Sequence, residues 1–405
     1  MSAGGQSPPT SALKIGLLLP PGEPDAPAIL QGARRGAEHA TRELGREVEL
    51  VVRGNPGQWG TEGDDAVALA LDEGAQALIA PTAGTAAHQV LQVAGRTRIP
   101  VVSLCSDSSV TSAGIPWTVR IAPRTDEEAA AVLTALKRIR ASEGNANGNA
   151  GGSLRVAAFV PAERAGREAA KDLRTAAATA AVELAEPIQV LTNTEPASVV
   201  AAAIAFKPEV ILLWLDAAQA GRLAKALRGA GFTGRLAGHS RLCSRVFSET
   251  AGKEVASGVV FALPSPGPRL GGASSGASPQ NAGAGVEAAP PGDEAVRGSK
   301  QHLPMLVRDW TLPEPTNALP SLAAALAFDA TRLLAHVLHR AGDEPPFREF
   351  PLTWTLPGAT GELAFDRSGN RQQALEVVEW AQDGLRVLAR GSRSSGDAER
   401  RLPAP

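Results

Sequence analysis

Two short apolar runs, each opening onto a loop of small and hydroxyl residues, place the strongest constraint on this fold. Ala77 to Ile79 leads into Pro81-Thr82-Ala83-Gly84-Thr85, and Val101 to Leu104 leads into Cys105-Ser106-Asp107-Ser108-Ser109. The stretch between them predicts a helix to about Arg96, with Thr85 as its cap. Strands joined in this way are parallel and end at the same edge of a sheet, where α/β proteins bind ligands. We therefore expect a small-ligand site at that edge.

Apolar runs alternate with helical patterns along most of the chain. Up to Arg120 four strands alternate with three helices, and a second series of the same kind begins at Leu154. This alternation is typical of parallel sheets with right-handed crossovers. Two series in tandem favour two lobes, and 405 residues are enough to bury two cores. The predicted fold class is α/β, with two Rossmann-like lobes that each hold a parallel central sheet.

Three segments fall outside this pattern. Residues 1–12 are expected to form a flexible tether, residues 263–293 a disordered insert, and residues 391–405 a frayed tail. The insert consists mostly of Gly, Pro, Ser and Ala, which offer too little apolar surface to offset the entropy of ordering. Elsewhere, Thr125 and Glu128 have the spacing of a capping box, which predicts a helix start.

Charge and composition argue against several classes of protein. The formal net charge of -2 gives no long-range field for holding nucleic acid or an anionic membrane surface. We expect no transmembrane helix, because no apolar run reaches about 18 residues. Cys105 and Cys243 are too few for a disulfide framework. The start of the chain lacks the basic and apolar segments of a signal peptide, so the protein either stays inside the cell or follows a removed signal.

Several motifs carry a family resemblance. The first is Gly32-Ala33-Arg34-Arg35-Gly36-Ala37-Glu38. The others are Pro100 to Ser103 with Asp107 to Thr111, then Trp117 to Pro123, Phe328 to Ala330, and Gly361 to Arg371. Together, and in this order, they resemble the leucine/isoleucine/valine-binding family of solute receptors. The similarity covers about Leu13 to Leu388, apart from the insert.

The resemblance implies a type I periplasmic-binding fold whose lobes close on a ligand. Lobe 1 would hold residues 13–121 and 262–341, and lobe 2 residues 122–261 and 342–390, joined by a three-strand hinge. The implied function is capture of a small polar ligand, an amino acid or related compound, for delivery to the membrane permease of an ABC-type transporter. We expect a monomer located outside the cytoplasm, periplasmic or tethered to the membrane. A cytoplasmic ligand sensor of the same fold is the alternative.

The resemblance also implies a set of ligand-binding positions. In this family, lobe 1 loops hold the ligand's carboxylate and ammonium with backbone N–H groups and hydroxyls. The matching positions are Thr82, Ala83, Gly84, Thr85, Cys105 and Asp107. The family usually has threonine where Asp107 stands, and an aspartate repels a carboxylate but pairs with an ammonium. In lobe 2, Ala165, Asp216 and Ser240 stand where the family has two aromatic residues and an acidic one.

Two interpretations of these substitutions remain open. In the first, the pocket is retuned, so that Asp107 or Asp216 takes a cationic group and Arg241 takes an anionic one. In the second, these are solvated loop residues and the family's amino-acid site has been lost. Loop residues at a switch point are enriched in binding roles, which favours the first interpretation.

No motif supports an enzyme, and no cofactor or metal is expected. Gly272-Ala273-Ser274-Ser275-Gly276 fits the nucleophile-elbow pattern, but it lies in the expected insert instead of a strand-turn-helix. His336 and His339 could share a helix face, yet no further metal ligands lie near them in the sequence. Cys105 has no histidine paired with it, so a small packing residue is the default interpretation. Catalysis on this scaffold remains a third and weaker alternative.

Overall fold

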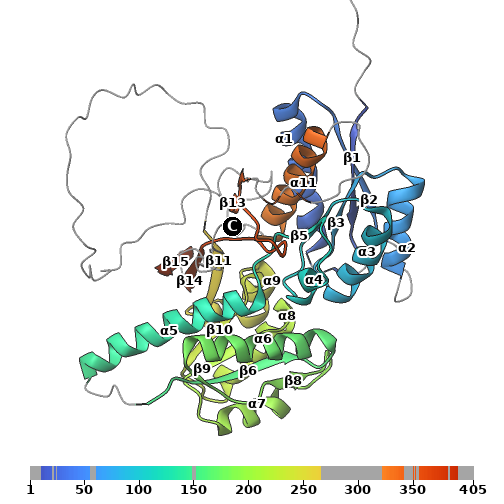
Figure 1. Cartoon of the computed structure of the whole chain (residues 1–405). Helices are drawn as coiled ribbons and strands as arrows, with labels where there is room; N and C mark the ends of the chain where they lie inside the picture. Colours follow the sequence, from blue (N-terminus) through green and yellow to red (C-terminus); the bar gives the residue numbers. More distant parts are fainter. Residues whose placement is uncertain are drawn as a thin grey trace, which may run out of the picture.

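The computed structural model describes residues 11–20, 22–23, 25–54, 61–147, 152–265, 322–341, 350, 352, 355–381 and 384–390. Within them the chain forms two main sheets, each covered by helices on both faces (Figure 1). Three expected segments lie wholly or largely outside the described residues. They are most of the tether, the insert from residue 266 onward, and the whole tail.

The first sheet has five parallel strands in the order β2-β1-β3-β4-β5. The strands are β1 (Leu13–Leu18), β2 (Val48–Arg53), β3 (Ala77–Ala80), β4 (Val101–Ser103) and β5 (Thr118–Arg120). The helices around it are α1 (Ala26–Leu44), α2 (Thr61–Val67), α3 (Gly84–Thr97), the short α4 (Ser109–Ser112) and α11 (Leu322–Ala341), with a π-helical turn at Ala68–Asp72. Helices α1 and α11 cover one face, and α2 and α3 cover the other.

Two glycines explain how α1 and α11 pack so closely. A β-carbon at Gly32 would lie 2.0 Å from the carbonyl oxygen of Ala324, and one at Gly36 would lie 2.6 Å from that of Phe328. Both distances are too short for any residue with a side chain, so the two helices approach through these positions. The glycines of the first family motif therefore serve helix packing.

The second sheet joins eight strands in the order β15-β14-β11-β10-β9-β6-β7, with β8 also paired to β6. The strands are β6 (Arg155–Pro161), β7 (Glu183–Leu184), β8 (Ile188–Val190), β9 (Val210–Leu213), β10 (Arg235–Gly238), β11 (Val260–Pro264), β14 (Leu375–Ala381) and β15 (Gly384–Arg390). Helices α5 (Thr125–Asn147) and α6 (Arg164–Ala180) pack on one face. On the other face lie α7 (Pro196–Ala205), α8 (Ala217–Gly229), α9 (Arg245–Ala251) and α10 (Lys253–Ala256). The strands from β6 to β11 run parallel, and β14 and β15 add an antiparallel edge.

Two of the expected segment boundaries disagree with the sheets. Leu263 and Pro264, expected at the start of the insert and in lobe 1, belong to β11 and pair with β14 in the second sheet. Part of the segment 342–390, expected in lobe 2, packs on the first core, because Phe350, Leu363 and Phe365 join the cluster that contains β1 and α11. The remaining division into lobes stays a prediction.

The late family motifs build the junction between the two sheets. Strands β12 (Leu356–Gly358) and β13 (Gly361–Leu363) form a hairpin whose turn is held by the fully buried Asp329 of α11. The Asp329 carboxylate accepts hydrogen bonds from Ala359 N at 2.6 Å and Thr360 N at 2.8 Å. Nearby, the backbone N–H of Arg120 donates to Gly369 O at 2.8 Å. These motif residues are scaffold, since their polar groups bind the protein's own backbone.

Both predicted helix caps are wrong, although α5 does begin at Thr125, as the capping-box pattern predicted. Helix α3 begins at Gly84, and its N-cap is Ala83 with no side-chain cap, so Thr85 lies inside the helix. The Thr125 hydroxyl donates to Ser106 O, and Glu128 interacts with Ser240, so the two residues do not cap each other.

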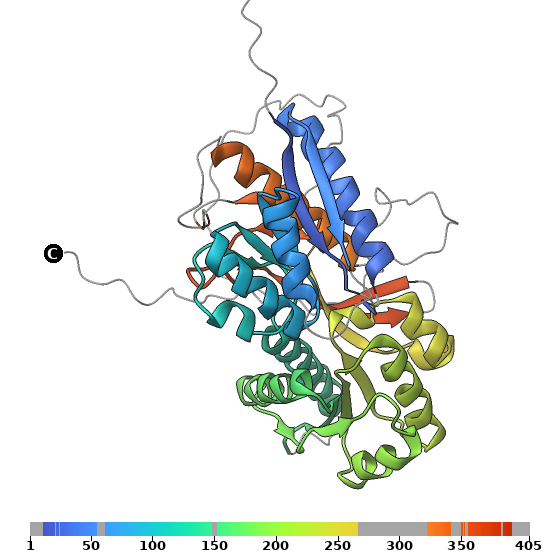
Figure 2. The ribbon, with the colours of Figure 1, turned by 90° about the vertical axis from the view of Figure 1, so that its right-hand side faces the viewer.

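Helix α11 is the one helix of the described chain that is long and apolar enough to cross a membrane. Most of that helix is buried inside the protein, against α1 and the first sheet. Its apolar composition therefore fits a core helix. In Figure 2 the first sheet and its helices lie above the second sheet and its helices.

Candidate ligand-binding cleft

A cavity of about 460 Å³ lies where the strand ends of the two sheets meet. It is lined by the loops that follow β1, β3 and β4 on one side, and by those that follow β6, β9 and β10 on the other. This volume falls within the ~300–1,000 Å³ usual for small-molecule sites. Among the predicted site residues, all except Ser240 line it: Thr82, Ala83, Gly84, Thr85, Cys105, Asp107, Ala165 and Asp216.

Ser240 lines a smaller cavity of about 30 Å³ that adjoins the cleft. The two cavities share Thr82, Ser106, His239 and Arg241, so the smaller one, the inner cavity, borders the larger. Glu128 also lines the inner cavity and is only 2% exposed. Burial raises the pKa of its carboxyl to about 8, against the opposing effect of a hydrogen bond to Ser240, so Glu128 is largely protonated at neutral pH.

The donors of the Thr82 loop are occupied by a side chain of the protein itself. The Thr82 hydroxyl donates to Glu23 Oε2 at 2.6 Å, and the Thr82 backbone N–H donates to the same oxygen at 3.3 Å. The other oxygen, Glu23 Oε1, lies 3.4 Å from Nη2 of Arg241, which follows β10 in the second sheet. The same nitrogen lies 3.3 Å from Asp25 Oδ2. Arg241 therefore joins the two sides of the cleft.

The Asp107 loop is ordered by its own polar groups. Asp107 Oδ1 accepts hydrogen bonds from Ser109 N at 2.9 Å and from Ser109 Oγ at 2.7 Å. The backbone N–H of Asp107 donates to Cys105 Sγ at 3.3 Å. Burial raises the pKa of the Cys105 thiol to about 12, so it is not a thiolate nucleophile at neutral pH. Cys105 thus acts as a buried acceptor that shapes the turn.

The second side of the cleft supplies an aromatic wall and a neutral histidine. Trp214 and His239 pack edge to face with ring centroids 5.5 Å apart. Burial and, next, the positive charge of Arg241 lower the pKa of His239 to about 4, while Nε2 lies 2.8 Å from Leu215 O. Asp216 caps α8 because its Oδ1 accepts a hydrogen bond from Gln219 N at 2.9 Å.

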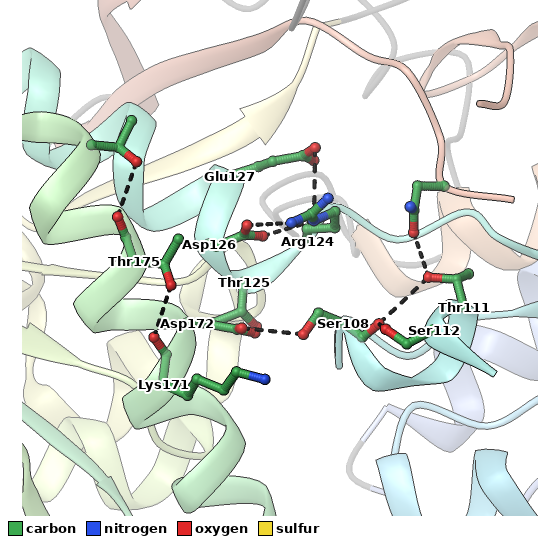
Figure 3. Close-up of polar contacts among 12 residues, drawn as sticks. Ser108, Thr111, Ser112, Arg124, Thr125, Asp126, Glu127, Lys171, Asp172 and Thr175 are labelled. Atoms are coloured by element: carbon green, nitrogen blue, oxygen red, sulfur yellow. Dashed lines mark hydrogen bonds and ion pairs between the residues drawn. The ribbon is translucent and has the colours of Figure 1, made fainter. Parts of the chain in front are cut away.

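A second contact across the cleft involves Asp172 of α6 (Figure 3). Its Oδ1 accepts a hydrogen bond at 3.1 Å from the hydroxyl of Ser108, which lies in the loop after β4. The pKa of Asp172 is raised to about 6, mainly by burial and then by the negative charge of Asp126. The nearby charge of Asp107 raises it further, while the hydrogen bond from Ser108 opposes the shift.

Negative side chains dominate the cleft. Arg241 is the only lysine or arginine among the described residues that line it. The lining carboxylates are Glu23, Asp25, Glu62, Asp107, Glu168, Asp172 and Asp216. Within the described part of the chain, no group of three or more acidic, histidine or cysteine side chains is arranged to hold a metal ion.

Several lining residues were not predicted from the sequence, although a helical spacing or a position after a strand could have indicated some of them. Ala165, Ala169 and Asp172 are spaced by four and three residues, with Glu168 beside them, and such positions share one face of a helix. Glu23 follows β1 and so lies at the same sheet edge as the other loops. Glu128 carried no such signal, because only the packing of α5 against Ser240 places it at the inner cavity.

Comparison with known proteins identifies the family. A model of periplasmic binding proteins matches residues 12–291, which is more than half of the chain. The chain belongs to the periplasmic binding protein family. Members of this family with the type I fold have two α/β halves with parallel central sheets, as this chain does. A comparison with curated proteins gave no match.

Solved structures share the fold at low sequence identity. The leucine-binding protein LivK of Thermotoga maritima is 17% identical, with a TM-score of 0.69 over 94% of this chain and 99% of that one. LivJ of Streptococcus pneumoniae, in complex with isoleucine, is 15% identical, with a TM-score of 0.68 over 94% and 100%. A solute-binding protein of an ABC transporter from R. palustris, in complex with benzoate, is also 15% identical, with a TM-score of 0.68 over 95% and 98%.

Proposed function

We propose that this protein is a non-catalytic solute receptor that binds a small polar ligand between its two halves. The observation that carries the proposal is the cleft of about 460 Å³ lined from the strand ends of both sheets. Open α/β sheets bind ligands at such edges. Polar contacts from Arg241 to Glu23 and from Ser108 to Asp172 already link the two sides. A ligand that touches both sides would favour the closed arrangement.

The relatives support a role in transport. LivJ was solved with isoleucine, and a solute-binding protein of an ABC transporter from R. palustris was solved with benzoate. By analogy, this receptor acts as a monomer outside the cytoplasm and hands its ligand to the permease of an ABC-type transporter. Fractionation of cells that produce the full-length protein tests the location. Recovery only from the cytosol contradicts this part of the proposal.

A thermal-shift screen against amino acids, amides, amines and short-chain acids tests the binding function. A compound that binds the folded protein raises the melting temperature once its concentration exceeds its dissociation constant. Replacing Asp107 with alanine should weaken binding at least tenfold, or by about 1.4 kcal/mol.

A matched control is Glu47→Ala. Glu47 is exposed and immediately precedes β2, so it lies at the opposite edge of the first sheet from the cleft. This variant should bind as the parent does. Equal affinities of the Asp107→Ala and Glu47→Ala variants for that compound would show that Asp107 does not contact the ligand.

A further inference from the structure

Glu23 holds the place that a ligand carboxylate would need. Both Thr82 donors, which the family resemblance assigns to the ligand, bind Glu23 Oε2 at 2.6 and 3.3 Å. The Glu23 side chain is only 2% exposed, so it is a built part of the site. The one basic side chain of the described lining, Arg241, is also engaged, at 3.4 Å from Glu23 and 3.3 Å from Asp25. The cleft thus offers an acidic ligand no uncommitted cation and no free Thr82 donors.

Carboxylates without a cationic partner remain on both sides. Asp107 comes from the first sheet, and Glu168, Asp172 and Asp216 come from the second. None of these four forms an ion pair with any described residue, and Asp172 is only 6% exposed. Like charges that face each other across a narrow cleft repel. A cation placed between them would offset this repulsion and favour closure of the two sides.

The inner cavity beside the cleft points to a bound polar group independently of these charges. Glu128 is 2% exposed, and its Oε1 has no hydrogen-bond partner among the described residues. This side chain lines the inner cavity beside Ser240 and Arg241. The protonated Glu128 carboxyl can both donate and accept a hydrogen bond, and an unpaired buried polar oxygen is costly, so a polar group of a bound molecule would stabilise it.

We propose that the cleft binds an organic cation with two separated ammonium or guanidinium groups and no carboxylate. This inference rests on the proposed function and names its ligand class. Two positive groups match carboxylates that come from opposite sides of the cleft. An extended organic cation fits better than a metal ion, because no set of described acidic, histidine or cysteine side chains converges as metal ligands. A carboxylate-bearing ligand would meet Glu23 and Asp107, so the same charges select against it.

Isothermal titration calorimetry with a four-carbon series tests the sign of the ligand's charge. Putrescine carries two positive charges, γ-aminobutyrate is a zwitterion, and succinate carries two negative charges. Putrescine should bind at least about tenfold more tightly than γ-aminobutyrate, and succinate should not bind. Affinity for putrescine should fall as sodium chloride rises from about 20 mM to about 500 mM, because salt screens the attraction.

Charge-neutralising variants locate the effect in the cleft. Glu168→Gln and Asp172→Asn should each weaken putrescine binding by at least about fivefold, since each removes one nearby negative charge. Glu183→Gln is the control, because Glu183 is exposed on β7 in the same half but at the amino-terminal edge of the sheet. It should bind putrescine as the parent does. Equal losses in all three variants would mean only a general effect of net charge and would overturn the inference.

Isoleucine, benzoate and magnesium ions complete the titration set and separate the possible failures. Binding of isoleucine, benzoate, γ-aminobutyrate or succinate without putrescine would overturn the cation inference and leave the proposed function standing. Binding of magnesium without putrescine would replace the organic cation with a metal. If none of these compounds binds at millimolar concentration, the cleft is not a solute site and both proposals fail.

Discussion

Replacing Gly84 with alanine should displace the Asp107 carboxylate without touching Asp107 itself. A β-carbon at residue 84 would lie 2.5 Å from Asp107 Oδ2, whereas ordinary contact begins at 3.4 Å. The carboxylate must therefore move by roughly 0.9 Å if the helix stays in place. Its other oxygen is held by Ser109 N at 2.9 Å and Ser109 Oγ at 2.7 Å, so this movement strains both hydrogen bonds.

The expected change in stability is small, while the expected change in affinity is large. A hydrogen bond to a charged group contributes about 1.5–3 kcal/mol, and here it is weakened rather than removed. Replacing glycine with alanine in a helix raises the free energy of unfolding by up to about 1 kcal/mol, which offsets part of this loss. We therefore expect the free energy of unfolding to change by less than about 1 kcal/mol, measured by urea denaturation. The putrescine dissociation constant, measured by calorimetry, should rise at least tenfold, or by about 1.4 kcal/mol.

Gly95 on the same helix provides the matched control. It is exposed, and no atom lies within 4 Å of a β-carbon built there. Gly95→Ala should raise the free energy of unfolding by about 0.5–1 kcal/mol and leave the dissociation constant unchanged. Equal dissociation constants for the Gly84→Ala and Gly95→Ala variants would refute the claim that the position of Asp107 controls binding.

Three further predictions concern stability and reactivity. Asp329→Asn should lower the free energy of unfolding by about 3 kcal/mol in urea, because the amide nitrogen of asparagine cannot accept the buried hydrogen bonds that Ala359 and Thr360 donate to the carboxylate, whereas the exposed Asp64→Asn should change it by less than about 0.5 kcal/mol; equal effects would contradict the junction described above. The pKa of Glu128 is about 8 when folded and near its ordinary 4.5 when unfolded, so the folded state holds the extra proton and stability should fall as pH rises from about 6.5 to 8. The folded-state pKa values of His239 and Asp172, about 4 and about 6, lie below this window, and Glu128→Gln should flatten the slope; a slope that survives in this variant would show that another group causes it. Burial raises the pKa of Cys105 and Cys243 to about 12. A thiol reagent should therefore label the native protein at least about a hundredfold more slowly than the protein in urea. Rapid labelling of the native protein would show that the loops open readily.

Local pattern was enough to predict the fold class and the position of the site loops. The buried strands β3 and β4 are short apolar runs bounded by turn residues, and such runs show directly in a sequence. Once parallel strands are inferred, their carboxyl ends must share one edge. This is why the sequence alone places the loops of Thr82 and Asp107 at the same edge of the sheet.

Features that depend on distant contacts could not be predicted in this way. Helix α3 begins at Gly84 instead of after Thr85, at a residue without a side chain, where the Asp107 carboxylate packs closely. In the sequence, Glu23 is an ordinary polar residue of a proline-rich loop, and nothing near it indicates a role. Its role depends on a hydrogen bond with Thr82, 59 positions away. Likewise, Leu263 and Pro264 continue β11 because residues of β14, more than a hundred positions later, pair with them. No local window contains these partners.

Hydrogen–deuterium exchange with and without saturating putrescine tests most directly whether a solute binds between the two halves. The account predicts that binding slows exchange on both sides together, in the loops around residues 82–86 and 105–109 and in those around 161–169 and 239–241. The amino-terminal edges of β2 and β7 should exchange at unchanged rates. Protection confined to one side, or absent from both pairs of loops while calorimetry reports binding, would contradict a ligand site in this cleft.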